Sequence, residues 1–131
     1  MILLDTHVLV WWVSDAKKLS RKAHVALRDA LDHDGFFVSA ISMWELSMLL
    51  KKGRLTVSID SELWLDQIEA TKGFHIVPVD SVIARSSVFL PGILHDDPAD
   101  RMIIATARSL GISLVTADKK IREYQHVKTI W

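Results

Sequence analysis

Short apolar runs alternate along the whole chain with longer segments of helical periodicity. The apolar runs have the length of buried strands, and the longer segments repeat apolar residues every three or four positions. Strands are expected at residues 1–4, 36–38, 74–79, 112–115 and 127–131. Helices are expected at about 7–13, 20–33, 40–52, 60–73, 80–89, 98–110 and 119–124. This alternation predicts the α/β class, as a three-layer α/β/α sandwich around a central, mainly parallel sheet.

Polar residues and glycine mark where the predicted helices begin and end. Thr6 and Ser20 each precede a helical segment, and each is expected to cap it. Asp97 followed by Pro98 is typical of a helix start, and Gly111 lies where that helix should end. No repeat, low-complexity tract or linker divides the sequence, so residues 1–131 are expected to form one domain.

The composition is that of a globular chain without a strong charge. Half of the residues are hydrophobic, and 16 basic residues balance 16 acidic ones. There is no cysteine, which excludes disulfides and thiolate metal sites and agrees with a reducing cytoplasm. Asp5 interrupts the apolar N-terminal run, which lacks the basic segment of a signal peptide, and no stretch is long enough to span a bilayer.

The neutral balance does not predict a strongly basic nucleic-acid binder, so any such binding must come from local patches. Three basic clusters are present, at residues 17–22, 51–54 and 119–122. Such clusters are usually solvated surface, although they can also contact phosphates.

Four acidic residues lie where chemistry is expected in this fold class. Asp5 and Asp118 follow two buried strands, at the edge where open α/β sheets bind ligands. Glu45 lies one helical turn from apolar neighbours, where an unpaired carboxylate is unfavourable. Asp100 shares an apolar helix face with Ile103 and therefore points inward. Each acid also has a structural explanation: Asp5, Asp100 and Asp118 can serve helix capping, and Glu45 can pair with a lysine or arginine.

If the first and fourth strands are neighbours, the topology brings these acids together. Unpaired carboxylates would repel each other and raise each other's pKa, and a hard dication removes that repulsion. All-oxygen ligands suit Mg²⁺ or Mn²⁺, which can bind a phosphodiester and lower the pKa of a bound water. No residue has the surroundings of a covalent nucleophile, and no glycine-rich phosphate loop is present.

Four segments carry a resemblance to a known family. Asp5-Thr6-His7, Ser42-Met43-Trp44-Glu45, Asp97-Pro98-Ala99-Asp100-Arg101 and Thr116-Ala117-Asp118 are together similar to the motifs of PIN-domain ribonucleases. The sequence resembles most the VapC-type toxins of toxin–antitoxin pairs. The similarity covers essentially the whole chain in order and spacing.

The resemblance implies a function and a set of site residues. It implies endoribonuclease activity dependent on Mg²⁺ or Mn²⁺, with single-stranded or looped RNA as the substrate. It places the acidic quartet, as metal ligands and catalytic residues, on Asp5, Glu45, Asp100 and Asp118. It implies that the protein forms homodimers and is neutralised by a small antitoxin, whose tail lies in the groove that contains the acids. Supporting roles are implied for Thr6, Thr116 and Asp97.

Two other interpretations stay open at this point. A receiver-like or phosphatase-like domain would use Asp5 as a phosphate acceptor, but position 7 is His7 where a second aspartate would be needed. A catalytically silent interaction module would use the acids to cap helices or to bind a structural metal. Metal-dependent RNA cleavage that is lost in Asp5→Ala would separate the nuclease from both.

Overall fold

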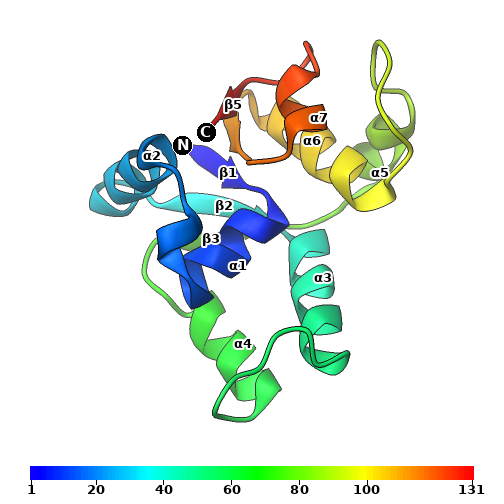
Figure 1. Ribbon diagram of the computed structural model, residues 1–131. Helices are drawn as coiled ribbons and strands as arrows, with labels where there is room; N and C mark the ends of the chain where they lie inside the picture. The colour runs from blue at the N-terminus through cyan, green and yellow to red at the C-terminus, as the bar shows by residue number, and fades with distance from the viewer.

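The computed structural model describes all 131 residues and contains one five-stranded sheet (Figure 1). The strand order is β3-β2-β1-β4-β5, and every neighbouring pair is parallel. The prediction of a mainly parallel sheet is therefore confirmed. The strands are β1 (Ile2–Leu4), β2 (Phe36–Ser39), β3 (Phe74–Val77), β4 (Ser113–Val115) and β5 (Thr129–Ile130).

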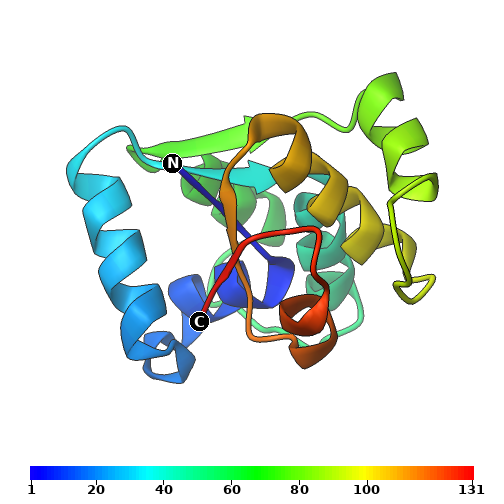
Figure 2. The same ribbon diagram turned by 90° about the horizontal axis from the view of Figure 1, so that it is seen from above.

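Helices cover both faces of this sheet, which confirms the three-layer sandwich. Figures 1 and 2 show α6 and α7 on one side of β1 and β4, with α1 and α2 on the other. None of the helices combines the length and the apolar character needed to cross a membrane. The helices are α1 (Thr6–Ser14), the 3-10 turn η1 (Ala16–Lys18), α2 (Arg21–Asp32), α3 (Ala40–Lys51), α4 (Ser61–Glu69), α5 (Ser81–Val88), α6 (Pro98–Leu110) and α7 (Lys119–Glu123).

The central strands are apolar on both faces because both faces are covered. In β1, Ile2 and Leu4 join a buried cluster with α1 and α2, whereas Leu3 between them joins a second cluster with α6 and α7. Consecutive side chains of a strand point to opposite faces, so one short run contributes to both cores. An unbroken apolar run therefore predicts a strand that, like β1, is buried on both faces.

Local capping sets the helix starts, with one correction to the sequence analysis. Ser20, Asp97 and Asp118 each cap the helix that follows them, as expected, and Asp80 caps α5 in the same way. The expected cap at Thr6 is wrong: Asp5 has extended backbone angles and its carboxylate accepts from the Thr6 N–H, so the helix already includes Thr6. Two strands are also shorter than expected, because β3 ends at Val77 and β5 covers two residues.

The position of β1 in the sheet determines where the candidate site lies. β1 pairs with β2 on one side and with β4 on the other. In the pairing with β4, Leu3 lies opposite Leu114. Parallel strands end at the same edge, so the segments after β1, β2 and β4 leave the sheet side by side. These segments begin α1, α3 and the loop to α7, which carry three of the four expected acids.

Candidate active site

Asp5 is the buried centre of the carboxyl edge, with 2% of its surface exposed. Its Oδ1 accepts from the Thr6 N–H at 2.8 Å, and its Oδ2 accepts from the Thr116 hydroxyl at 2.7 Å. The Thr116 Oγ1 in turn accepts from the Asp118 N–H at 3.1 Å. Thr116 therefore connects the acids that follow β1 and β4.

Glu45 lies in the second turn of α3 and reaches the same edge through Thr6. The Thr6 hydroxyl donates to Glu45 Oε1 at 2.6 Å, and its oxygen lies 2.9 Å from the Ser42 hydroxyl. Burial raises the pKa of Glu45, and the charge of Asp5 adds to that rise, although the Thr6 hydrogen bond opposes it. No lysine or arginine pairs with Glu45, so the alternative of a basic partner is not supported.

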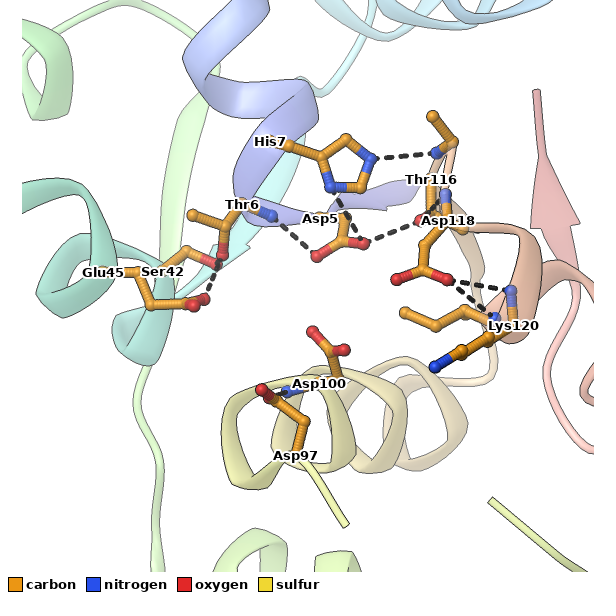
Figure 3. Close-up of polar contacts among 12 residues, drawn as sticks. Asp5, Thr6, His7, Ser42, Glu45, Asp97, Asp100, Thr116, Asp118 and Lys120 are labelled. Carbon is orange, nitrogen blue, oxygen red and sulfur yellow. Dashed lines mark hydrogen bonds and ion pairs between the residues drawn. The ribbon is translucent and has the colours of Figure 1, made fainter. Parts of the chain in front are cut away.

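Asp100 faces the other acids from the first turn of α6 (Figure 3). Its N–H donates to Asp97 Oδ1 at 2.9 Å, which is the helix cap expected for Asp97. Burial is the largest cause that raises the pKa of Asp100 from 3.8 to about 7, and the neighbouring carboxylates add to it. The contributing charges are those of Asp5, Asp97, Asp118 and Glu45.

Asp118 approaches from the loop between β4 and α7. Its Oδ1 accepts from the Lys120 N–H at 2.8 Å and from the Ile121 N–H at 3.4 Å, so this oxygen caps α7. Figure 3 shows the Asp118 carboxylate on the side of Asp5 that faces Asp100. Capping and membership in the acidic cluster are therefore compatible for this residue, because the two oxygens can have different partners.

Two histidines also belong to the site, although the sequence did not indicate that they would. His7 Nε2 accepts from the Ala117 N–H at 3.0 Å, and its Nδ1 lies 3.5 Å from Asp5 Oδ2. His95 Nδ1 accepts from the Asp97 N–H at 3.3 Å, and its Nε2 lies 3.4 Å from Asp100 Oδ2. In each ring one nitrogen accepts, so the proton of the neutral ring is on the nitrogen that faces a carboxylate.

The structure thus brings the whole expected set of acids and supporting residues to one edge, from four separate parts of the chain (Figure 3). No three of these side chains converge closely enough to hold a single ion in this arrangement. The donor chemistry still fits a hard dication, because the groups are carboxylate and hydroxyl oxygens and no lysine or arginine forms an ion pair with them. Burial and then the neighbouring carboxylates raise the pKa of Asp100, and no lysine or arginine is paired with it to oppose that rise.

The parallel α/β sandwich gathers carboxylates at its carboxyl edge, which is where open α/β folds bind ligands and build their active sites. The family model of the PIN domain matches residues 2–127. This chain therefore belongs to the PIN-domain family.

Named relatives agree with this assignment. The chain is 36% identical over 132 aligned residues to "Ribonuclease VapC22" of Mycobacterium tuberculosis, covering 99% of this chain and 98% of that protein. Its fold is similar to a DNA-bound VapBC structure from Salmonella typhimurium, with a TM-score of 0.70, 18% identity and coverage of 98% and 95% of the two chains. A toxin–antitoxin complex from Klebsiella pneumoniae has a similar fold, with a TM-score of 0.69, 23% identity and coverage of 97% and 95%.

Proposed function

We propose that this protein is a metal-dependent endoribonuclease and the toxin of a type II toxin–antitoxin pair. The observation that carries the proposal is the group of acids around Asp100: burial first, and then the neighbouring carboxylates, raise the pKa of Asp100 to about 7, and no lysine or arginine pairs with it. Family membership and the similarity to a VapC ribonuclease support RNA as the substrate. The alternative, a catalytically silent interaction module that binds a structural metal, would also hold these acids together, and it is separated from the nuclease by the absence of RNA cleavage.

The proposed site residues are the acidic quartet and its supports. Asp5, Glu45, Asp100 and Asp118 would hold Mg²⁺ or Mn²⁺, which supplies positive charge for the phosphodiester and lowers the pKa of an attacking water. Hydrolysis then forms a bond from the water oxygen to phosphorus, and the bond from phosphorus to one ester oxygen breaks. That leaving oxygen takes up a proton as the water loses one.

The supporting residues act by orientation. Thr116 holds Asp5 and the Asp118 backbone together, and Thr6 holds Glu45 by a short hydrogen bond. Asp97 caps α6 and so fixes the turn that carries Asp100. These contacts support a positioning role, because each one ties a proposed site residue to its neighbour in the site.

The proposed partners follow from the relatives. VapBC and other toxin–antitoxin complexes are among the structures with this fold, which supports a cognate antitoxin for this chain. We place the protein in the cytoplasm, where its RNA substrates are. Homodimer formation stays a prediction, and sedimentation in solution tests it: a dimer has twice the chain mass of 14.8 kDa.

The direct test is incubation of labelled structured RNA with purified protein and Mg²⁺ or Mn²⁺. We expect defined internal cuts with either metal, and no cuts in EDTA or with Asp100→Asn. Asp60→Asn is the matched control, because Asp60 also caps a helix but lies outside the site. Cleavage that persists in EDTA would contradict the proposal, as would a folded protein that cuts neither this RNA nor total cellular RNA and does not arrest growth when it is expressed.

A further inference from the structure

Trp44 is an exposed aromatic side chain next to the acidic site. It is 60% exposed, whereas the other four tryptophans of the chain are half-buried. It precedes Glu45 on α3, which begins beside α6 and leads toward the loop before α4 (Figure 1). Exposed apolar residues are common on proteins, so what distinguishes Trp44 is its place beside Glu45 in the lining of two hollows.

A hollow of about 220 Å³ lies along one side of Trp44. Its wall includes Trp44 and Met48, and its inner end is formed by Thr6 and Glu45, which are hydrogen bonded to each other at 2.6 Å. The hollow is therefore continuous with the acidic site. A second, larger and mainly apolar hollow meets Glu45 on the other side of Trp44, so the indole forms a ridge between two depressions.

Two cations also line the smaller hollow. Lys52 and Arg54 are exposed, and neither forms an ion pair. Lys52 lies seven residues after Glu45 on the same helix, a separation of about 10 Å along the helix axis. One hollow thus runs from the acids, past an aromatic face, to positive charge.

We infer that this hollow binds an unpaired nucleotide of the RNA beside the cleaved phosphodiester. The base stacks on Trp44, and the adjoining phosphate contacts Lys52 and Arg54. This inference rests on the proposed function, and it assigns to Trp44, Lys52 and Arg54 the contacts that hold this nucleotide of the RNA. An aromatic face combined with free cations is typical of single-strand binding, because every base has a stacking face and every nucleotide carries a phosphate.

The positive charge in the hollow favours RNA over a protein as its ligand. An apolar helix of a partner protein would contact Trp44 and Met48 but would make no use of the positive charge of Lys52 and Arg54. A nucleotide satisfies both features, since its base is apolar on the face and its phosphate is anionic. Repulsion between the phosphates and Glu45 is avoided because the cations lie at the opposite end of the hollow from the acid.

The test measures binding separately from cleavage. A fluorescent, mixed-sequence single-stranded RNA decamer is titrated into Asp100→Asn protein, in which the proposed cleavage is silent, with and without Trp44→Ala. We expect Trp44→Ala to weaken binding roughly 10-fold to 100-fold, the loss typical of a base-stacking ring, and Trp44→Phe to restore most of it. Val25→Ala is the control, because Val25 is an apolar residue on α2 with a similar exposure of 59%.

The cations are tested by salt dependence in the same assay. Lys52→Ala with Arg54→Ala should reduce the slope of log Kd against log salt by about 0.7 for each lost phosphate contact. Lys17→Ala with Lys18→Ala, in the exposed turn η1, should leave the slope unchanged.

Three outcomes overturn the inference: no RNA binding by the parent protein, unchanged binding in Trp44→Ala, or loss of binding only because the oligomeric state changes. Sedimentation of each variant detects the last, which would assign Trp44 to a protein interface. Binding without cleavage by the wild-type protein would instead contradict the proposed function and leave the hollow as an RNA site.

Discussion

At the scale of single residues, the electrostatics of the site centre on Asp100. Its pKa of about 7 results first from burial and then from four neighbouring carboxylates, and its nearest nitrogen partner is His95 at 3.4 Å. A carboxyl group with a raised pKa binds a proton in the folded chain at pH values where the unfolded chain has released it. The folded state therefore loses stability as pH rises from about 4 to about 7.

Asp100→Asn should abolish most of this pH dependence in metal-free protein. The shift from 3.8 to about 7 corresponds to at most ~4 kcal/mol, and partial solvent access reduces the expected effect to about 2 kcal/mol. Urea unfolding at pH 5 and pH 8 in EDTA measures it. The wild-type protein should lose more stability at pH 8 than the variant, and Mn²⁺ should reduce the difference; equal loss in both proteins would contradict the assignment.

Sequence reasoning identified the acids but not all of their partners, and the reason is physical. Asp5 and Asp118 follow apolar runs, and Asp97 precedes a proline, so local patterns indicate their positions. The link from His7 to Ala117 spans 110 residues and depends on strand order, which local patterns do not contain. The same holds for Ser42, whose hydroxyl meets Thr6 from a different helix.

At the scale of elements, the site depends on how the start of α1 is attached to the loop before α7. His7 belongs to the first turn of α1, and its Nε2 accepts the Ala117 N–H of that loop. Packing against Trp11 holds the ring, with centroids 5.0 Å apart. His7 thus adds a second side-chain link, beside that of Thr116, between the segments that carry Asp5 and Asp118.

His7→Leu should separate these segments, because the Ala117 N–H then loses its acceptor. We expect a loss of about 1–2 kcal/mol in the free energy of unfolding and a lower kcat with a smaller change in KM. His7→Gln should recover much of both, since its amide oxygen can accept the same N–H. His24→Leu, at an exposed position of α2, is the control. Wild-type kcat in His7→Leu would show that this attachment has no role in the reaction.

The elements themselves were largely predictable, with errors where tertiary contacts decide the boundary. Serine and aspartate caps set the helix starts at Ser20, Asp80, Asp97 and Asp118, and the sequence contains that signal. The error at Thr6 arose because Asp5 and Thr6 are both good caps. Thr6 instead directs its hydroxyl to Glu45, a contact that becomes visible only once α3 is placed.

At the scale of the whole molecule, the parallel sheet makes one site from distant segments. β1 lies between β2 and β4, so the acids at positions 5, 45 and 118 leave one edge, and α6 adds Asp100 from across it (Figure 3). The alternation of strands and helices predicted this class of fold, but the strand order that joins β1 to β4 could only be assumed. The neutral net charge is consistent with a site whose positive charge is supplied by metal and by local cations such as Lys52.

The central claim is that four acids form one metal site for RNA cleavage, and double substitution tests it most directly. Single-turnover cleavage in Mn²⁺ is compared for Asp5→Asn, Glu45→Gln, Asp100→Asn, Asp118→Asn and the double variant Asp5→Asn with Asp100→Asn. We predict that each single change lowers the rate by about 100-fold or more, and that the double variant is no slower than the slower single one, because the residues act as a unit. Near-normal rates in the single variants, or fully multiplied losses in the double variant, would contradict the account.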